Sequence, residues 1–106
     1  MKIVHLMAMA AALSVSASVF AADDGEALFK KSGCVACHTV EKKSVGPSMK
    51  DVAAKYKDDK EAQAKLQEKV RNGGKGSFGT MPMPATKASV SDENIKSIVE
   101  WALSRK

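Results

Sequence analysis

The five residues "CVACH", Cys34 to His38, restrict what this chain can fold into more than any other feature. They include both cysteines of the chain and one of its two histidines. Two sulfurs with this spacing and an imidazole directly behind them suit three chemistries. These are a dithiol that cycles through a disulfide, part of a zinc site, and an anchor for covalently attached haem.

The first 21 residues have the pattern of a cleaved secretory signal peptide. Lys2 gives a positive start, residues 3–19 carry no formal charge, and Val19-Phe20-Ala21 places small residues before a cleavage point. A retained membrane anchor is the alternative, but the Ala and Ser content makes this segment weakly apolar for a membrane span. We therefore predict export without stable membrane insertion, which places the thiols in an oxidising compartment.

The predicted mature domain, residues 22–106, is small for a self-sufficient hydrophobic core. It contains 85 residues, with one Trp, one Tyr and two Phe. Domains of this size bury a smaller share of their surface than larger ones do. A disulfide, a metal or a bulky cofactor is therefore expected at the centre of the domain.

The mature chain carries 16 basic and 12 acidic residues, a net charge of +4. This excess favours acidic partners, although scattered lysines are also compatible with a role in solubility alone. Nucleic-acid binding is not predicted, because the chain is exported, nearly free of arginine and without interleaved aromatic and basic residues.

The apolar periodicity predicts four helices and no convincing strand, which makes the fold class all-α. The expected helix starts are Asp23 or Asp24, Ser48, Asp58 (in a capping box with Glu61) and Ser91. Trp101 lies off the centre of the last apolar stripe, so we expect it to be partly buried against the first helix or a cofactor. The segment Gly73 to Ser89 is too broken by Gly and Pro for regular structure, and a loop this long is usually functional or disordered.

Haem is the chemistry that uses the whole CVACH stretch. A redox dithiol is typically found in a βαβ setting, which this sequence lacks. A structural zinc site needs four protein ligands, whereas Cys34, Cys37 and His38 are the only Cys or His of the mature chain. In the haem interpretation the two cysteines add to the porphyrin vinyl groups and His38 becomes the proximal iron ligand.

The sixth iron position decides between an electron carrier and an enzyme. A thioether raises the reduction potential and blocks other ligands, whereas an open or labile position would indicate a haem enzyme or gas sensor. The mature chain offers Met49, in an apolar helical stripe, and Met81 and Met83, in the long loop. Pro82 and Pro84 stiffen the segment around Met83 and are expected to keep it out of helices and sheets, which favours Met83 without excluding Met81.

Five stretches carry a resemblance to a known family: "LFKKSGCVACHTV", "VGPSMKDVAAKY", "KVRNGGKGSFG", "MPMP" and "SDENIKSIVEWALSRK". Over nearly all of residues 23–106 the chain resembles the small bacterial monohaem class I cytochromes c, the cytochrome c-551/c-552 family. The resemblance implies the small class I fold, with four to five short helices around one covalently bound haem c. It also implies a soluble, monomeric electron carrier of the periplasm that is not an enzyme.

The resemblance assigns roles to individual residues. Cys34 and Cys37 are implied as the thioether anchors, His38 as the proximal ligand and Met83 as the distal ligand. Met81 stands where family members often have an aliphatic residue, so the resemblance chooses Met83.

Further positions are implied as contacts around the cofactor. Pro47 resembles the proline whose carbonyl accepts a hydrogen bond from the proximal histidine. Lys69 and Arg71 fall where basic groups lie near the haem propionates, and Thr86 stands where an Asn often contacts the ligating sulfur. Phe78 replaces a Trp that would donate a hydrogen bond to a propionate.

The implied partners are redox proteins with acidic docking patches, such as a quinol-oxidising complex, a terminal oxidase, a nitrite reductase or a peroxidase. Docking is expected to be transient and steered by exposed lysines. The candidates are Lys42, Lys43, Lys50, Lys75 and Lys87.

Overall fold

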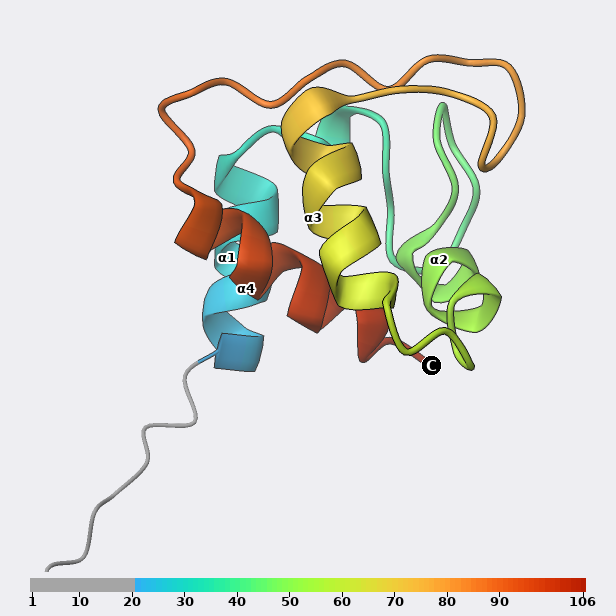
Figure 1. Ribbon diagram of the computed structural model, residues 1–106, viewed down its shortest axis with the longest axis horizontal. Coiled ribbons are helices and arrows are strands. Elements are labelled where there is room, and N and C mark those ends of the chain that lie inside the picture. Colours follow the sequence, from blue (N-terminus) through green and yellow to red (C-terminus); the bar gives the residue numbers. More distant parts are fainter. Residues whose placement is uncertain (1–20) are drawn as a thin grey trace, which may run out of the picture.

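The computed structural model describes residues 21–106, which form four α-helices and one 3-10 turn with no strand in that range (Figure 1). The elements are α1 (Ala21–Lys31), η1 (Cys34–Ala36), α2 (Met49–Lys55), α3 (Ala62–Asn72) and α4 (Asp92–Leu103). The prediction of an all-α fold with four to five short helices is confirmed. None of these helices is long and apolar enough to cross a membrane. Apart from Ala21, the predicted signal peptide lies outside the described residues.

Helix α4 is the centre of the core, because it contacts α1, α2 and α3. The ring of Trp101 on α4 packs against Phe29 on α1 with 4.9 Å between ring centroids. This confirms the predicted contact between Trp101 and the first helix. Trp101 is only 2% exposed, so it is buried more deeply than predicted. The main cluster of buried residues consists of Phe29, Met49, Val52, Ile98, Trp101 and Ala102.

The crossing of α1 and α4, visible in Figure 1, is closest at Gly25. A Cβ at this position would lie 2.4 Å from the Trp101 Cβ and 2.5 Å from the Ser97 carbonyl oxygen. Neither atom belongs to the flexible end of a side chain, so the two helices would have to separate. The absence of a side chain at residue 25 therefore sets how closely the helices approach.

Gly25→Ala is expected to destabilise the fold. Alanine favours a helix over glycine by about 1 kcal/mol, but forcing a methyl group into this contact costs roughly 1–3 kcal/mol. The difference is a net loss of up to about 2 kcal/mol in the free energy of unfolding, measured by guanidinium titration. Ala27→Gly, at an exposed position of the same helix, is the control and should show only the propensity cost. A stability equal to or above that of the unmodified protein would contradict the tight crossing.

Two of the predicted helix starts are confirmed in detail. The Ser48 hydroxyl accepts a hydrogen bond from the Asp51 amide at 3.0 Å, and the Ser91 hydroxyl accepts one from the Asn94 amide at 3.1 Å. Each satisfies a backbone donor that the first helical turn leaves free.

The other two starts differ from the prediction. Helix α1 already includes Ala21, ahead of the expected cap. At α3 no capping box forms, because the Asp59 carboxylate accepts the Glu61 amide at 2.9 Å and pairs with Lys65 at 2.8 Å. The hydrogen bond from Lys65 holds the pKa of Asp59 below its ordinary value. The Asp59 carboxylate, in the turn before α3, thus takes the place of the predicted capping box.

The segment from the end of α3 to the start of α4 runs along one edge of the molecule (Figure 1). Its irregular structure confirms the prediction for Gly73 to Ser89, with one exception. Gly74 and Met83 form an isolated antiparallel bridge, with 2.7 Å from the Met83 amide to the Gly74 carbonyl and 3.0 Å for the reverse bond. Met83 joins no helix or strand, as the flanking prolines predict, but it retains its own N–H and so can form this single bridge.

Candidate haem site

An apolar cleft of about 1060 Å³, measured out to its opening, lies among all four helices and the long loop. The helices contribute Phe29, Met49, Val52, Leu66, Val70, Ile98, Val99 and Ala102 to its walls. The walls are therefore suited to a large, flat, mostly apolar group.

The residues of the CVACH stretch reach this cleft together. Cys34, Cys37 and His38 all line it. The η1 turn brings these three residues to the cleft, since the amides of Cys37 and His38 both donate to the Cys34 carbonyl, at 3.1 and 2.9 Å. Gly33, with φ of 83°, provides the left-handed residue that separates α1 from this turn.

The imidazole of His38 is oriented by the backbone. Its Nδ1 lies 2.8 Å from the Pro47 carbonyl oxygen, the contact expected from the sequence. A carbonyl only accepts hydrogen bonds, so Nδ1 carries the proton and Nε2 keeps a free lone pair. This arrangement fixes the tautomer that a metal-ligating histidine requires.

Gly46, which sequence reasoning did not single out, allows the chain to pass the imidazole at close range. A Cβ at residue 46 would lie 2.5 Å from the Cε1 atom of His38 and 2.8 Å from its Nδ1. The Gly46 amide also donates to the Cys37 carbonyl at 2.8 Å, so the backbone cannot easily withdraw. The ring of His38 is thereby confined between Gly46 and Pro47.

Gly46→Ala is expected to displace the imidazole and weaken its bond to Pro47. Overpacking at such a contact costs roughly 1–3 kcal/mol of folding free energy. The test is guanidinium unfolding, together with the nuclear magnetic resonance signal of the His38 ring proton on Nδ1. Val45→Ala, at the exposed neighbouring position, is the matched control. An unshifted ring signal would contradict the proposed confinement.

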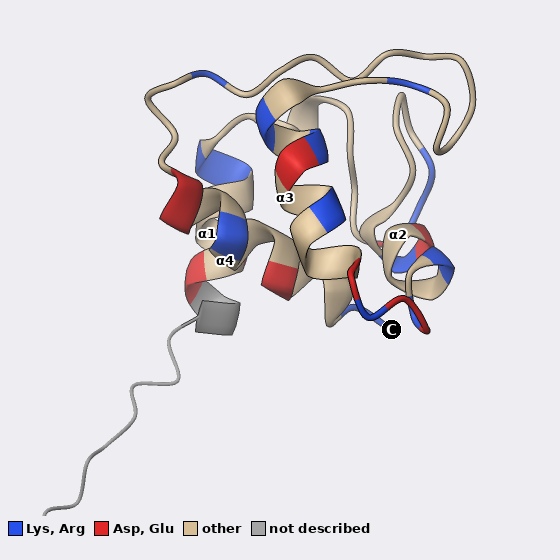
Figure 2. Cartoon of the chain, viewed as in Figure 1, with Lys and Arg blue, Asp and Glu red and all other residues tan. Residues whose placement is uncertain are grey.

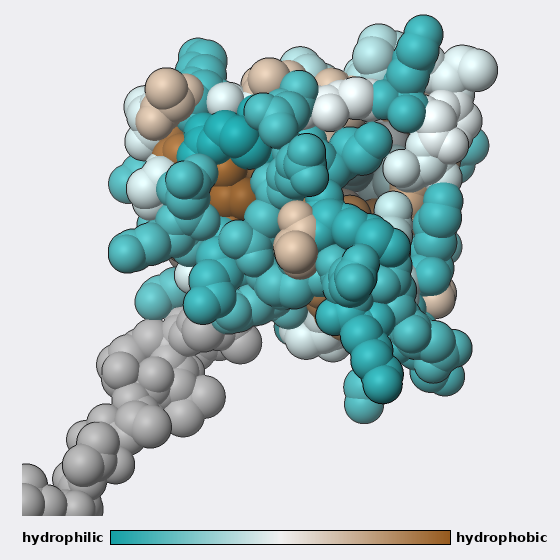
Figure 3. Space-filling model, in the orientation of Figure 1, coloured by the Kyte–Doolittle hydropathy of each residue, from teal (hydrophilic) through white to brown (hydrophobic). Residues whose placement is uncertain are grey.

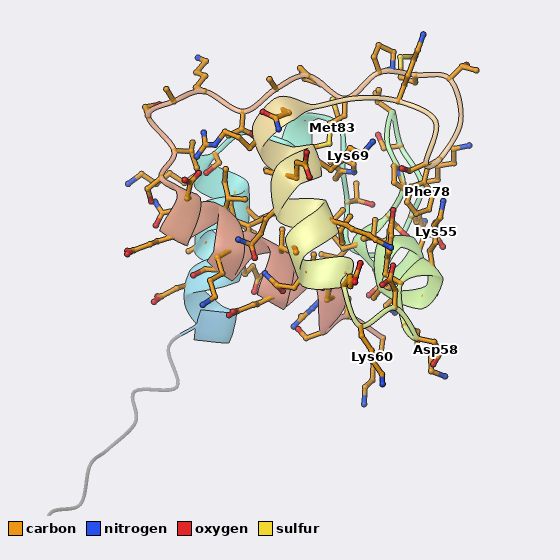
Figure 4. All side chains as sticks on the ribbon, in the orientation of Figure 1. Lys55, Asp58, Lys60, Lys69, Phe78 and Met83 are labelled. Carbon is orange, nitrogen blue, oxygen red and sulfur yellow. The ribbon has the colours of Figure 1, made fainter. Side chains whose placement is uncertain are left out.

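All three methionines of the described residues line the cleft, but with different exposure. Met49 is 6% exposed and belongs to the buried cluster, whereas Met81 is 66% exposed at the opening. Met83 is partly buried, and its backbone is held by the bridge to Gly74. In Figure 4 Met83 lies at the C-terminal end of α3, close to Lys69. Of the two methionines on the loop, Met83 is thus the one that combines access to the cleft with a fixed backbone.

The three cofactor contacts implied on α3 and the loop differ in where their side chains lie. Lys69 lines the cleft, as expected for a residue near a propionate. Arg71 and Thr86 are not among the lining residues: the Arg71 guanidinium binds Asp92 and the Thr86 hydroxyl donates to the Val70 carbonyl at 2.6 Å. The structure does not bring these two side chains to the cleft, because tertiary hydrogen bonds invisible in the sequence engage them elsewhere.

Lys55 does not line the cleft itself but contacts two residues that do, a role that sequence reasoning missed. Its ammonium group lies 4.4 Å from the centroid of the Phe78 ring and donates a hydrogen bond to the Ser77 carbonyl (Figure 4). A cation over an aromatic face is attracted to it. Lys55 therefore connects α2 to the loop that forms one wall of the cleft, and no local sequence pattern signals this contact.

The surroundings of Cys34 do not favour the thiolate that a redox dithiol requires. Burial raises the pKa of the Cys34 thiol, an effect that a backbone hydrogen bond partly offsets and the neighbouring Cys37 adds to. A redox-active cysteine needs a lowered pKa. Two thiols, an imidazole and a thioether on one apolar cleft are instead the donor set of a haem c site, and the cleft fits that group.

A small all-α domain with one apolar cleft and this donor set defines a class I monohaem cytochrome c. Residues 22–106 match the family described as Cytochrome c. The chain is 46% identical over 85 residues to cytochrome c-551 of Pseudomonas aeruginosa, covering 80% of each protein. It is 40% identical over 104 residues to cytochrome c-551 of Stutzerimonas stutzeri, covering 98% of this chain and 96% of the relative.

A solved structure shares the fold. The crystal structure of wild-type Nitrosomonas europaea cytochrome c552 is 44% identical, with a TM-score of 0.72 over 76% of this chain and 99% of that one. The chain therefore belongs to the cytochrome c family, with cytochromes c-551 and c-552 as its relatives. It is a small electron carrier whose cofactor is one covalently attached haem c.

Proposed function

We propose that this chain carries single electrons in a periplasmic respiratory chain, with its haem c held by Cys34 and Cys37 and ligated by His38 and Met83. One observation carries the proposal: these four side chains line the same apolar cleft. Lys69 is proposed as a contact to the propionates, because it is the basic predicted contact among the lining residues.

The haem supplies an iron that gains and loses one electron without breaking a bond. The protein contributes ligands and their orientation. The Pro47 carbonyl makes the His38 ring more electron-donating, while a Met83 thioether raises the reduction potential. The apolar walls exclude water, and the Gly74 bridge keeps the Met83 backbone in place. Ligands held in this way limit rearrangement when the charge on the iron changes.

We propose that the opening of the cleft is the surface that meets redox partners. Three lining residues there are unusually exposed for their type: Val45 at 53%, Phe78 at 39% and Met81 at 66%. Lys75 is an exposed lining residue beside them. An apolar rim with a nearby cation suits a small, transient interface with an acidic patch.

The other predicted steering lysines are dispersed. Figure 2 shows basic positions on every helix, interspersed with acidic ones, and further basic positions on the loop, and the face in Figure 3 is largely hydrophilic. Lys50 is paired with Glu41 at 2.6 Å, which reduces its contribution to steering. Lys75 is therefore the lysine on which we base the test below.

The visible spectrum of the protein expressed with export tests the proposed function. A low-spin spectrum in both oxidation states, with no binding of carbon monoxide to the reduced form, is expected for an electron carrier with two protein ligands. Rapid carbon monoxide binding would favour a haem enzyme or gas sensor. A colourless protein with two free thiols would overturn the proposal altogether.

Electron transfer to the natural partner is expected to slow several-fold as salt is added from about 0.01 to 1 M, because the Debye length falls from about 30 to 3 Å. Stopped-flow kinetics measures this dependence. Lys75→Gln should lower the rate at low salt and flatten the salt response. Lys106→Gln, an exposed lysine that does not line the cleft, is the control and should change neither. A flat response in the unmodified protein would mean that the positive charge serves solubility alone.

A further inference from the structure

Arg71 binds the segment that follows Met83 to the last turn of α3. Its Nη1 donates to the Lys87 carbonyl at 3.2 Å, and its Nη2 donates to the Val90 carbonyl. Its Nε and Nη2 both donate to one carboxylate oxygen of Asp92, at 3.0 and 2.8 Å. One guanidinium thus joins α3, the loop and the start of α4.

The Arg71 side chain is mostly covered by the segment that it holds. Its exposed fraction is 28%, against 89% for Asp92. Because the ion pair has one fully accessible partner, it contributes little by itself. The bonds to two backbone carbonyls are more important, since a planar guanidinium makes several fixed hydrogen bonds at once and a lysine does not.

The same turn of α3 holds the loop at two further points. The Thr86 amide lies 3.2 Å from the Val70 carbonyl, and its hydroxyl donates to the same oxygen at 2.6 Å. The Met83 amide donates to Gly74, just beyond the helix, at 2.7 Å. Met83 is therefore fixed directly by the bridge, while the segment on its C-terminal side is fixed by Thr86 and Arg71.

We propose that Arg71 is a positioning residue that keeps the Met83 thioether in the cleft by holding residues 86–91 on α3. This inference rests on the proposed ligation by Met83. The Met83 thioether is a neutral ligand on a loop rich in glycine and proline. How long it stays bound to the iron therefore depends on how rarely the loop opens. Local opening of such a segment is governed by its few tertiary contacts, and Arg71 donates hydrogen bonds to three acceptor groups of this segment and the start of α4.

Displacement of the sixth ligand by cyanide in the oxidised holoprotein tests this role. Arg71→Met keeps the apolar stem but removes all the hydrogen bonds, and we expect the displacement rate to rise about ten-fold or more. Arg71→Lys should also raise the displacement rate, because a lysine cannot bridge both carbonyls. Asp92→Asn leaves the carbonyl bonds in place and should change the rate much less.

Ile95→Val is the control for a purely structural effect. Ile95 is 1% exposed and does not line the cleft, so this variant loses global stability without loosening the loop. If Arg71→Met and Ile95→Val accelerate displacement equally at matched stability, Arg71 only supports the fold and the proposal is overturned. An unchanged rate in Arg71→Met would overturn it as well.

Amide hydrogen exchange separates this proposal from the ligand assignment. Faster exchange at the Met83 and Thr86 amides in Arg71→Met, but not in Ile95→Val, would support the holding role even if another group ligates the iron. The ligand assignment itself fails only if removal of Met83 leaves the visible spectrum unchanged. Unchanged protection of both amides in Arg71→Met would refute the holding role whatever the ligand is.

Discussion

Met83→Ala is expected to convert the low-spin haem iron to a high-spin or water-ligated form. The side chain is the candidate thioether with a backbone fixed at the cleft, through its two hydrogen bonds to Gly74. Axial ligands set haem potentials over a range of about 0.8 V, and methionine lies towards the upper part of it. We therefore expect the potential to fall by about 0.1 V or more. Visible spectroscopy and a redox titration measure the two effects.

Met81→Ala is the matched control, because it removes the same side chain two positions earlier in the same loop. Met81 is 66% exposed, so its loss should leave the spectrum nearly intact. The variant is still expected to slow transfer to the partner slightly, since it removes part of the apolar rim. A high-spin spectrum from Met81→Ala with an unchanged Met83→Ala protein would show that the wrong sulfur had been chosen.

The helices of this fold were predictable because their signals are local. Ser48 and Ser91 cap helices through a hydrogen bond three residues ahead, and the apolar stripe of α4 is buried as its spacing requires. The start of α3 was not predictable in the same way. Asp58 and Glu61 have the right spacing for a capping box, but Asp59 offers the chain a competing acceptor.

The candidate site was predictable to the extent that its chemistry is written in single residues. Cys34, Cys37 and His38 have side chains whose type and spacing already indicate haem, whereas the choice of Met83 over Met81 came from the family resemblance. The residues that hold these side chains in place give no such signal. Nothing in the sequence distinguishes Gly46 from the other loop glycines, although the His38 ring lies against it. The resemblance implied a cofactor contact for Arg71, but its partner Asp92 lies 21 residues away in the sequence and no local pattern signals it.

Loss of the haem is expected to unfold this domain. All four helices contribute apolar residues to the cleft, including five of the six in the main buried cluster. An empty cleft would either expose these walls to water or collapse and pull the helices from their positions. A domain of about 85 residues has only about 5–10 kcal/mol of stability to lose. The cofactor is therefore part of the core as well as the redox centre.

The variant that tests this carries both Cys34→Ser and Cys37→Ser, which removes covalent attachment but adds no bulk. We expect it to be isolated largely without haem and to lose most of the helical circular dichroism signal of the holoprotein. Val35→Ser lies in the same turn, is 49% exposed and should retain both haem and helices. If the haem-free double variant kept a native helical signal and a cooperative unfolding transition, the apolar contacts of α4 with the other helices would suffice alone. The small size of the core argues against that result, because ten buried apolar residues of the described chain must hold together helices of 7 to 12 residues that are too short to be stable by themselves.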